Sequence, residues 1–485
     1  MCWNIVENAK QLCDSFVSLF TLTFARKYDI LFSANKFGGI DLYFFSREVN
    51  FDDSYDVIVA GGGPAGVAAA CSAAREGAKT LLIEATGALG GMSTMGLVPA
   101  WCPFSDGERV VYRGFAERIL NAGKAKTKFV KIETLNWVPI NPEAMKVIYD
   151  DLTAEFGVDV LFGTTVSAVD SADRRVSTVV VSNKAGLTAY SAKFFVDCTG
   201  DGDLSAFAGA EFEQGSVGDR AAVQLATHCF ELGGVDDHAY TSGIRLHNAN
   251  PASPIHKIAA DDNYPFITDA HFCNNKIGED AVGFNAGHLP AFDATDPWAL
   301  SKAYPLGRKK AQDVARALAD YYPEAFGNCF VLQTAPLLGI RESRRIVCDY
   351  TLTAEDYLSR ATFPDEISRN CYYLDVHRTP AEIERDRAAG IPDSKFCARF
   401  GKGESHGIPY RSLAVKSFDN LLVAGRAISC DRRILGSVRV MPNCFTTGEA
   451  AGLAAALCLQ SGATTHTLDT CNLREKLRGY GAYIN

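Results

Sequence analysis

Three glycines, Gly61, Gly63 and Gly66, are spaced as G-x-G-x-x-G directly after a run of apolar, mostly β-branched residues. In this pattern the first glycine permits a tight turn, the second lets the backbone approach a pyrophosphate, and the third lets a helix pack close to a sheet. The free N–H groups at the start of that helix attract phosphate oxygens. Glu84 ends a second apolar run, where a carboxylate accepts hydrogen bonds from ribose hydroxyls. The spacing therefore predicts a bound dinucleotide, and the acid favours FAD or NAD over NADP.

The elements that must position these groups form a β-α-β unit over residues 55–84. Residues 56–60 and 80–83 are short and continuously apolar, which is typical of parallel strands buried on both faces. The helix between them begins near Pro64 and is rich in alanine, so it is slim enough to pack tightly. A glycine-rich turn without a ligand is the alternative, and the ordered sequence of strand, glycines, helix, strand and acid favours the nucleotide.

Later segments are expected to return to the same cofactor. Residues 87–96 form a glycine-rich loop, residues 194–203 read as a strand ending in a second glycine turn, and residues 419–426 repeat that pattern before an alanine-rich helix that opens at 446–448. No second G-x-G-x-x-G follows a strand, which favours FAD as a resident cofactor over NAD as a co-substrate. The predicted cofactor-binding residues are Gly61, Gly62, Gly63, Pro64, Ala65, Gly66, Glu84, Gly90, Gly91, Met92, Ser93, Val166, Thr199, Gly200, Asp201, Gly425, Arg426, Asn443, Thr447 and Gly448.

These patterns predict an α/β fold with a Rossmann-like FAD-binding domain around a central parallel sheet. That domain is expected to be discontinuous, with an inserted α+β substrate domain that is richer in His, Tyr, Phe and charged residues. The expected parts are an N-terminal extension (1–50), the first part of the FAD-binding domain (51–208), the inserted region (209–403), the second part of the FAD-binding domain (404–465) and a C-terminal tail (466–485).

Charge and cysteine content narrow the class of protein. The 485 residues carry a net charge of −9 without a basic block, so neither a nucleic acid nor an anionic membrane surface is an expected partner. The 15 cysteines are scattered and no C-x-x-C occurs, which favours reduced thiols in the cytoplasm over disulfides. The same scatter argues against an iron–sulfur cluster or a structural zinc, so we predict no metal site.

The N-terminal segment is the unusual part of the chain. Residues 12–24 are apolar but include Asp14, and they are too few to span a bilayer. We expect this segment to be an amphipathic extension, or extra residues translated from an upstream start codon. A leader peptide that is cleaved off is the alternative. No membrane span is expected.

Three residues are the predicted catalytic set. Arg341, grouped with Arg344 and Arg345 after an apolar segment, is suited to binding a substrate carboxylate or raising the flavin potential. A structural ion-pair network is the alternative for this cluster. Arg439 precedes the alanine-rich helix and is expected near the flavin or substrate. His406 is the candidate general acid or base because histidine titrates near neutral pH, and a hydrogen-bonded surface histidine is its alternative.

Several segments together resemble a known family. They are DVIVAGGGPAGVAAACSAAREGAKTLLIE, LGGMSTMGLV, DCTGDGDLSAFAGAE, RESRRIVCDYTLTAEDYL, GIPYRSLAVKSFDNLLVAGRAIS and LGSVRVMPNCFTTGEAAGLAAAL. From about residue 46 to about residue 462 the chain resembles the FAD-dependent oxidoreductase family of the glutathione-reductase-like flavoprotein superfamily. The resemblance implies non-covalent FAD and a two-domain fold with the isoalloxazine ring at the domain junction. The FAD module also resembles the heterodisulfide reductase flavin subunit, but the cysteine runs of that subunit are missing here.

The sequence therefore predicts an FAD-dependent oxidoreductase that exchanges a hydride between flavin N5 and a small-molecule substrate. Its expected partners are that substrate and either NAD(P)H or a redox partner protein. One alternative is a flavin-binding subunit that passes electrons to a partner protein. Another is a flavin-dependent tRNA modification enzyme, which the net charge of −9 disfavours.

Overall fold

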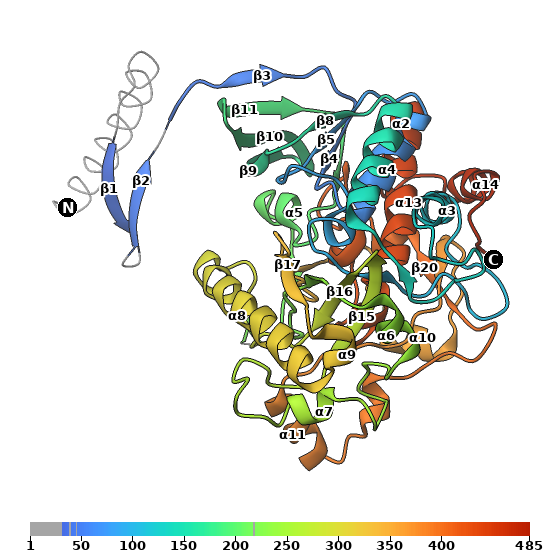
Figure 1. The fold of residues 1–485 in the computed structure, drawn as a ribbon. Coiled ribbons are helices and arrows are strands. Elements are labelled where there is room, and N and C mark those ends of the chain that lie inside the picture. Colours follow the sequence, from blue (N-terminus) through green and yellow to red (C-terminus); the bar gives the residue numbers. More distant parts are fainter. Residues whose placement is uncertain (1–31, 38–39, 45, 217–218) are drawn as a thin grey trace, which may run out of the picture. The chain divides into compact units, whose positions relative to one another are not determined.

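The computed structural model describes residues 32–37, 40–44, 46–216 and 219–485. The chain divides into two compact units, Met1–Phe51 and Asp52–Asn485. In the first unit, β1 (Phe32–Phe37) pairs antiparallel with β2 (Ile40–Phe44) (Figure 1). The apolar segment 12–24, for which we predicted an amphipathic extension, lies outside the described residues.

The centre of the second unit is a five-stranded sheet in which every neighbouring pair is parallel. Its strands, in spatial order, are β21 (Leu421–Val423), β12 (Phe194–Asp197), β4 (Val57–Ala60), β5 (Thr80–Ile83) and β8 (Asp159–Leu161). Chain order runs outward from β4 through β5 to β8, then restarts on the other side with β12. In such doubly wound sheets the ligand binds at this switch point, beyond the carboxyl ends of the two central strands. The predicted α/β class with a central parallel sheet is confirmed.

The two faces of this sheet are covered differently, because successive side chains of a strand point to opposite faces. Ile58 and Phe195 pack in one cluster with valines of an antiparallel sheet. Val57 and Val59 belong to the larger cluster on the other face, which is formed with the helices. The antiparallel sheet contains β9 (Thr165–Ala172), β10 (Arg175–Asn183) and β11 (Gly186–Ser191), and a tight turn joins the last two.

Two small-residue helices pack directly against each other on the helical face. They are α2 (Pro64–Arg75) and α13 (Met441–Ser461), and Figure 1 shows α4 (Pro142–Glu155) beside them. Their backbones approach so closely that a Cβ on Gly448 would lie 2.1 Å from the carbonyl oxygen of Ala65. Helix α13 begins at Met441, earlier than the predicted opening at 446–448, because Val440 is its N-cap and a proline occupies its first turn.

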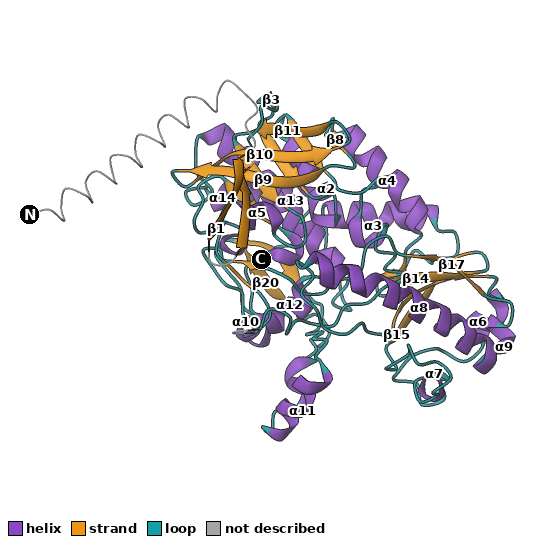
Figure 2. Ribbon diagram, turned by 90° about the vertical axis from the view of Figure 1, so that its left-hand side faces the viewer, coloured by secondary structure: helices purple, strands orange, loops and turns teal. Residues whose placement is uncertain are grey.

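A second sheet lies in the region that the sequence assigned to an insertion. It is antiparallel in the order β15 (Phe272–Gly278), β16 (Ala281–Ala286), β14 (Phe230–Gly233) and β17 (Phe330–Thr334). The long helix α8 (Pro297–Tyr321) covers it and shares its hydrophobic core. In Figure 2 this sheet and α8 are separate from the parallel sheet. The domain boundaries expected from the sequence stay a prediction.

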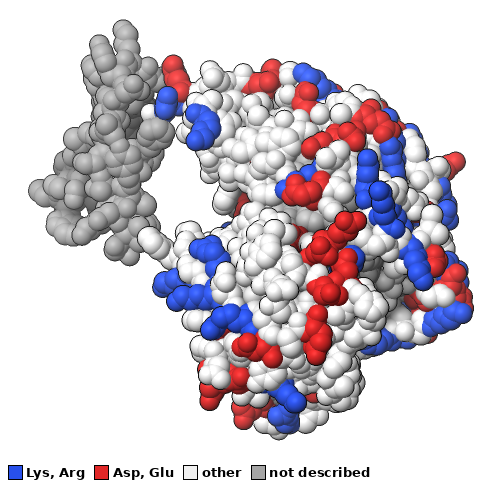
Figure 3. Space-filling view, viewed as in Figure 1, with Lys and Arg blue, Asp and Glu red and all other residues white. Residues whose placement is uncertain are grey.

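Shorter elements complete the described chain. The remaining strands are β3 (Asn50–Asp52), β6 (Ala100–Trp101), β7 (Val138–Pro139), β13 (Phe212–Glu213), β18 (Arg345–Ile346), β19 (Glu366–Asn370) and β20 (His406–Pro409). The remaining helices are α3 (Phe115–Lys126), α5 (Asp203–Phe207), α6 (Asp237–Ser242), α7 (Ile255–Ile258), α9 (Pro323–Phe326), α10 (Ala354–Ser359), α11 (Pro380–Ala388), α12 (Arg432–Val438) and α14 (Thr470–Gly479). Among the described residues, every helix falls short of the length and apolar character that crossing a membrane requires. On the face seen in Figure 3, acidic and basic side chains are interspersed.

Candidate active site

A cavity of about 2160 Å³ lies at the carboxyl ends of β4 and β12. Gly61 and Gly63 line it after β4, and Thr199 and Gly200 line it after β12. Other parts of its lining come from β15, β16 and the residues that follow them, such as Cys273, Asn285 and His288. Single ligand pockets usually measure about 300–1,000 Å³, so this cavity has room for a dinucleotide and a substrate together.

The first glycine turn is shaped to hold a pyrophosphate. Gly61 has φ +93°, and a Cβ there would lie 2.4 Å from the carbonyl oxygen of Cys198. The Glu84 carboxylate accepts a hydrogen bond from the Gly62 N–H at 2.7 Å and so fixes the turn. Gly63 is the N-cap of α2 and lines the cavity, and a Cβ on it would meet no described atom within 4 Å. The open space at a helix N-terminus is what a dinucleotide phosphate needs, so these residues fit FAD.

The second glycine turn is held by charged side chains. Asp197 is fully buried and accepts hydrogen bonds from the N–H and hydroxyl of Thr199. Arg426 donates to the carbonyl oxygen of Gly200 at 2.8 Å and to the carboxylate of Asp201 at 2.6 Å. These contacts join the loops after β12 and β21 into one wall of the cavity.

The predicted cofactor-binding residues divide into two groups. Those that line the cavity are Gly61, Gly63, Pro64, Ala65, Glu84, Gly91, Met92, Val166, Thr199, Gly200, Asp201, Gly425 and Arg426. Those that do not line it are Gly62, Gly66, Gly90, Ser93, Asn443, Thr447 and Gly448.

The start of α13 explains part of this division. Because the helix begins at Met441, its first turn brings Met441, Pro442 and Cys444 to the cavity wall. Asn443 turns inward and donates to the carbonyl oxygen of Val438 at 2.7 Å. The helix N-terminus thus reaches the cavity about one turn before the residues that the sequence indicated.

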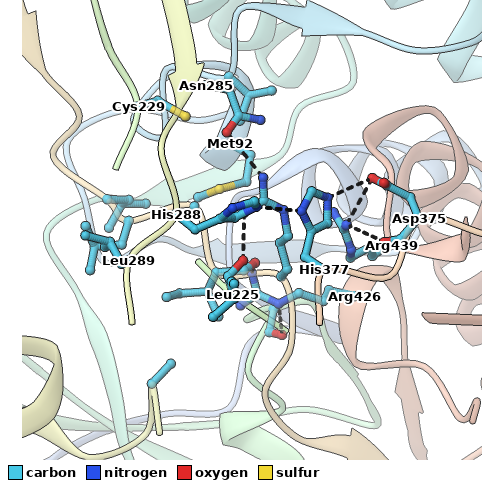
Figure 4. Close-up of a pocket in the computed structure, with 18 of the residues that line it drawn as sticks. Met92, Leu225, Cys229, Asn285, His288, Leu289, Asp375, His377, Arg426 and Arg439 are labelled. Atoms are coloured by element: carbon cyan, nitrogen blue, oxygen red, sulfur yellow. Dashed lines mark hydrogen bonds and ion pairs between the residues drawn. The ribbon is translucent and has the colours of Figure 1, made fainter. Parts of the chain in front are cut away.

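A chain of acidic and imidazole groups lines the side of the cavity opposite the glycine turns. His288 Nδ1 lies 3.2 Å from Asp269 Oδ2, and His288 Nε2 lies 2.7 Å from His377 Nδ1. His377 Nε2 lies 3.2 Å from Asp375 Oδ2, which also faces Arg439 at 3.4 Å (Figure 4). Of these five residues, only Arg439 was predicted from the sequence.

The fold brings these histidines together from distant segments. His271 immediately precedes β15 and His288 follows β16, so the pairing of this hairpin places them side by side, with ring centroids 4.3 Å apart. His377 lies in the coil between β19 and α11, where its carbonyl oxygen accepts a hydrogen bond from Leu225 N–H at 3.0 Å. In the sequence, a D-x-H pattern occurs at 269–271 and 375–377, but it also occurs at 236–238, outside this cluster.

Burial controls the charge of the cluster. Loss of hydration, reinforced by the nearby Arg341 charge, lowers the pKa of His377 to about 3. The same two causes lower the pKa of His271 well below its usual value. Burial also lowers the pKa of His288. These shifts favour neutral imidazoles at pH 7.

The three clustered arginines differ in their surroundings: two form ion pairs, and the third lines the cavity. Arg344 pairs with Asp203 at 2.7 Å, and Arg345 pairs with Glu342 at 2.6 Å. Arg341 lines the cavity, where burial lowers its pKa to about 10 and still leaves it cationic at pH 7.

Arg341 is held by neutral acceptors only. It donates to Leu225 O at 2.7 Å, to Thr227 Oγ1 at 2.6 Å and to Asn285 Oδ1 at 3.3 Å. No ion pair to Arg341 is found among the described residues, so its positive charge is available to the cavity.

His406 lies in the protein interior and does not line the cavity. Its ring accepts a hydrogen bond from Asn370 Nδ2 at 2.9 Å and faces the Gly407 carbonyl oxygen at 3.0 Å. Burial lowers the pKa of His406 to about 4, which favours the neutral form at pH 7.

We expect His406→Gln to change stability rather than the cofactor site. Loss of a matched pair of buried hydrogen bonds should lower the free energy of unfolding by about 1–3 kcal/mol. The FAD content and the visible spectrum of the bound flavin should stay unchanged. Denaturant unfolding and absorbance spectroscopy measure both quantities, and an altered flavin spectrum at unchanged stability would contradict this expectation.

The doubly wound sheet, the glycine turn at its switch point and the large cavity beside them define a dinucleotide-dependent enzyme. The sequence model of the FAD dependent oxidoreductase family matches residues 56–477, and the chain belongs to that family. It is an FAD-dependent oxidoreductase, and its cofactor is FAD. A search of curated proteins finds no match.

Solved structures with a similar course of the chain include a reductase-like protein, a monooxygenase and a hydroxylase. A geranylgeranyl bacteriochlorophyll reductase-like protein from Thermoplasma acidophilum has a TM-score of 0.44 and 15% identity, over 89% of this chain and 83% of that one. The p-nitrophenol 4-monooxygenase PnpA from Pseudomonas putida DLL-E4 has a TM-score of 0.42 and 12% identity, over 90% and 87%. The anhydrotetracycline hydroxylase OxyS from Streptomyces rimosus has a TM-score of 0.44 and 14% identity, over 87% and 65%. Likenesses this loose carry no conclusion about substrate.

Proposed function

We propose that this flavoprotein exchanges a hydride between flavin N5 and a carboxylate-bearing small molecule bound in the cavity. The observation that carries the proposal is that one cavity contains both the glycine turn for the cofactor and Arg341, a buried cation without an acidic partner among the described residues. Bound FAD supplies a ring that takes up or releases a hydride.

Arg341 is placed to orient such a substrate. Its hydrogen bonds to Leu225, Thr227 and Asn285 fix the guanidinium plane without neutralising the charge. A carboxylate that enters the cavity would therefore meet a rigid, partly desolvated cation, and charge-assisted hydrogen bonds of this kind are strong. Arg439 adds a second positive charge on the same wall.

The source or destination of the electrons is part of the proposal. We infer NAD(P)H or a redox partner protein as the second reactant, and we place the FAD module among the glutathione-reductase-like flavoproteins. Neither nucleic acid nor membrane has a part in this proposal, since the chain carries a net charge of −9.

An anaerobic absorbance titration tests the proposal. FAD-loaded protein is mixed first with NADH and NADPH, then with 2-hydroxy acids and amino acids, and with alcohols and amines of the same carbon skeleton. Bleaching of the flavin bands by carboxylate donors but not by the uncharged analogues is the expected result. If NAD(P)H bleaches the flavin, carboxylate-bearing acceptors should restore the bands. Equal responses to charged and uncharged compounds, or no response to any, would contradict the proposal.

Arg341→Met should separate substrate binding from cofactor binding. For a carboxylate compound found active in that titration, we expect kcat/KM to fall roughly 30-fold, because a hydrogen bond to a charged group contributes about 1.5–3 kcal/mol. Uncharged compounds should change less than about threefold, and FAD content should not change. Arg118→Met, on α3 and outside the cavity, is the control.

A further inference from the structure

We infer that His271, His288 and His377 form a binding site for one divalent transition-metal ion, with Zn²⁺ as the representative ion. All three side chains line the cavity, and one potential ligand nitrogen from each lies within 4.8 Å of the other two. Imidazole is a preferred ligand of zinc, copper, iron and nickel. The inference stands apart from the proposed hydride exchange, because metal binding is measured without substrate.

The geometry of the three rings suits a common ion. Nitrogens about 2.0–2.1 Å from a tetrahedral ion lie about 3.3 Å apart, and their ring centroids then lie about 4.5–5.2 Å apart. The observed centroid distances of 4.9 Å for His288–His377 and 5.2 Å for His271–His377 lie in this range. The distance of 4.3 Å for His271–His288 is shorter, so these two rings must also separate slightly. The close contact between His288 and His377 must open by roughly 0.6 Å for the ion to enter, on the same estimate.

Proton counting points to a cation between His288 and His377. When both rings are neutral, each has one N–H, yet the two rings make three contacts that each need a proton. If His288 Nδ1–H donates to Asp269 and His377 Nε2–H donates to Asp375, then His288 Nε2 and His377 Nδ1 face each other with lone pairs, 2.7 Å apart. In this tautomer arrangement a proton or a metal ion between the two nitrogens would remove the repulsion of their lone pairs.

The surroundings favour the metal ion over the proton. A proton bridges two nitrogens, whereas this cluster has a third: within the described structure, His271 Nδ1 is buried and has no hydrogen-bond partner. Histidines that bind metals usually donate their other N–H to a carboxylate, and Asp269 and Asp375 are placed for this role.

Charges of both signs surround the site. The positive charges of Arg341 and Arg439 oppose a cation, whereas Asp269 beside His288, and Asp375 beside His377 and Arg439, attract one. Three protein ligands with a fourth position left open are typical of catalytic rather than structural zinc. The fourth position here would face the cavity, where an oxygen of an anionic substrate could bind both the ion and Arg341.

Metal titration of FAD-loaded protein tests the inference. After treatment with a chelator, the protein is titrated with Zn²⁺ and with Co²⁺, whose ligand-field bands at the red end of the visible spectrum are separate from the flavin bands. One equivalent of metal by mass spectrometry, and histidine scattering in the X-ray absorption fine structure of the Zn²⁺ form, are the expected results. Binding of less than a tenth of an equivalent, or a spectrum without histidine ligands, would overturn the inference.

Variants identify the ligands. We expect His377→Ala to weaken Co²⁺ binding at least roughly 100-fold, and Asp375→Asn to weaken it roughly 10–100-fold, as removal of outer carboxylates does elsewhere. His256→Ala changes an exposed histidine outside the cluster and should bind like the unchanged protein. FAD content and thermal unfolding check that each variant is folded. Equal Co²⁺ affinity in His377→Ala and His256→Ala would also overturn the inference.

Discussion

Replacing Gly63 with valine is expected to give a folded protein that has lost its FAD. The backbone at Gly63 has φ −69° and ψ −173°, which any residue adopts, and a Cβ there meets no described atom within 4 Å. The added side chain therefore strains nothing in the protein. It would instead occupy the space at the start of α2 where the pyrophosphate must approach the backbone. We expect FAD affinity to fall at least roughly 100-fold, about 2.8 kcal/mol.

The measurement is FAD per chain after gel filtration, followed by a fluorescence titration with added FAD. Gly87→Val is the matched control, since a Cβ on Gly87 also meets no described atom within 4 Å, but Gly87 does not line the cavity. Far-ultraviolet circular dichroism establishes that both variants are folded. Full FAD occupancy in Gly63→Val would show that the pyrophosphate is not held at this turn.

Glu342→Gln is expected to be the most destabilising single change outside the cofactor turns. The Glu342 carboxylate is fully buried and contacts Arg345 at 2.6 Å and Arg432 at 3.0 Å, and it also accepts from Gln224 N–H at 2.8 Å. Removing its charge leaves Arg345, which is only 5% exposed, with only the exposed Glu213 at 3.4 Å as an acidic partner. Breaking a buried pair in this way costs about 3–5 kcal/mol.

Denaturant unfolding of the FAD-loaded protein measures this effect. Glu355→Gln is the control because Glu355 pairs with Arg433 at 3.3 Å but is 74% exposed, and exposed pairs contribute little. Combining Glu342→Gln with Arg345→Met should recover part of the lost stability, since no buried charge is then left uncompensated. Equal effects of Glu342→Gln and Glu355→Gln would contradict the expected difference.

The cofactor side of the site could be predicted because its signals are local. A strand, three glycines, a slim helix and an acid follow one another within residues 56–84, and each has a fixed role in one β-α-β unit. The return of the chain at Thr199 and at Gly425 was predictable for the same reason, since each glycine directly follows an apolar strand. The start of α13 lies before the predicted opening because Val440 is the N-cap and Pro442 occupies the first turn, where proline is favoured.

The reaction side could not be predicted in this way. His271 and His288 meet only through the register of the β15–β16 hairpin, and His377 joins them from a coil almost 90 residues further along, as the spacing from 288 to 377 shows. In the sequence, His406 is a candidate acid or base because histidine titrates near neutral pH, yet the structure gives it two interior hydrogen bonds. The residues around a single histidine in the sequence do not indicate whether its side chain will be buried. Only tertiary contacts distinguish a cavity histidine such as His377 from an interior one such as His406.

The position of β21 has a consequence for biosynthesis. The sheet needs β21 beside β12, and α2 needs α13 to cover its small residues, but both partners lie after residue 420. While the ribosome is still translating the middle of the chain, β12 therefore presents an unpaired edge, and unpaired edges of this kind invite aggregation. Long-range parallel pairing is also slow to form. Nascent chains should consequently depend on chaperones until residues 421–485 emerge. A premature stop before β21 should yield a product that is cleared rather than a partly active flavoprotein.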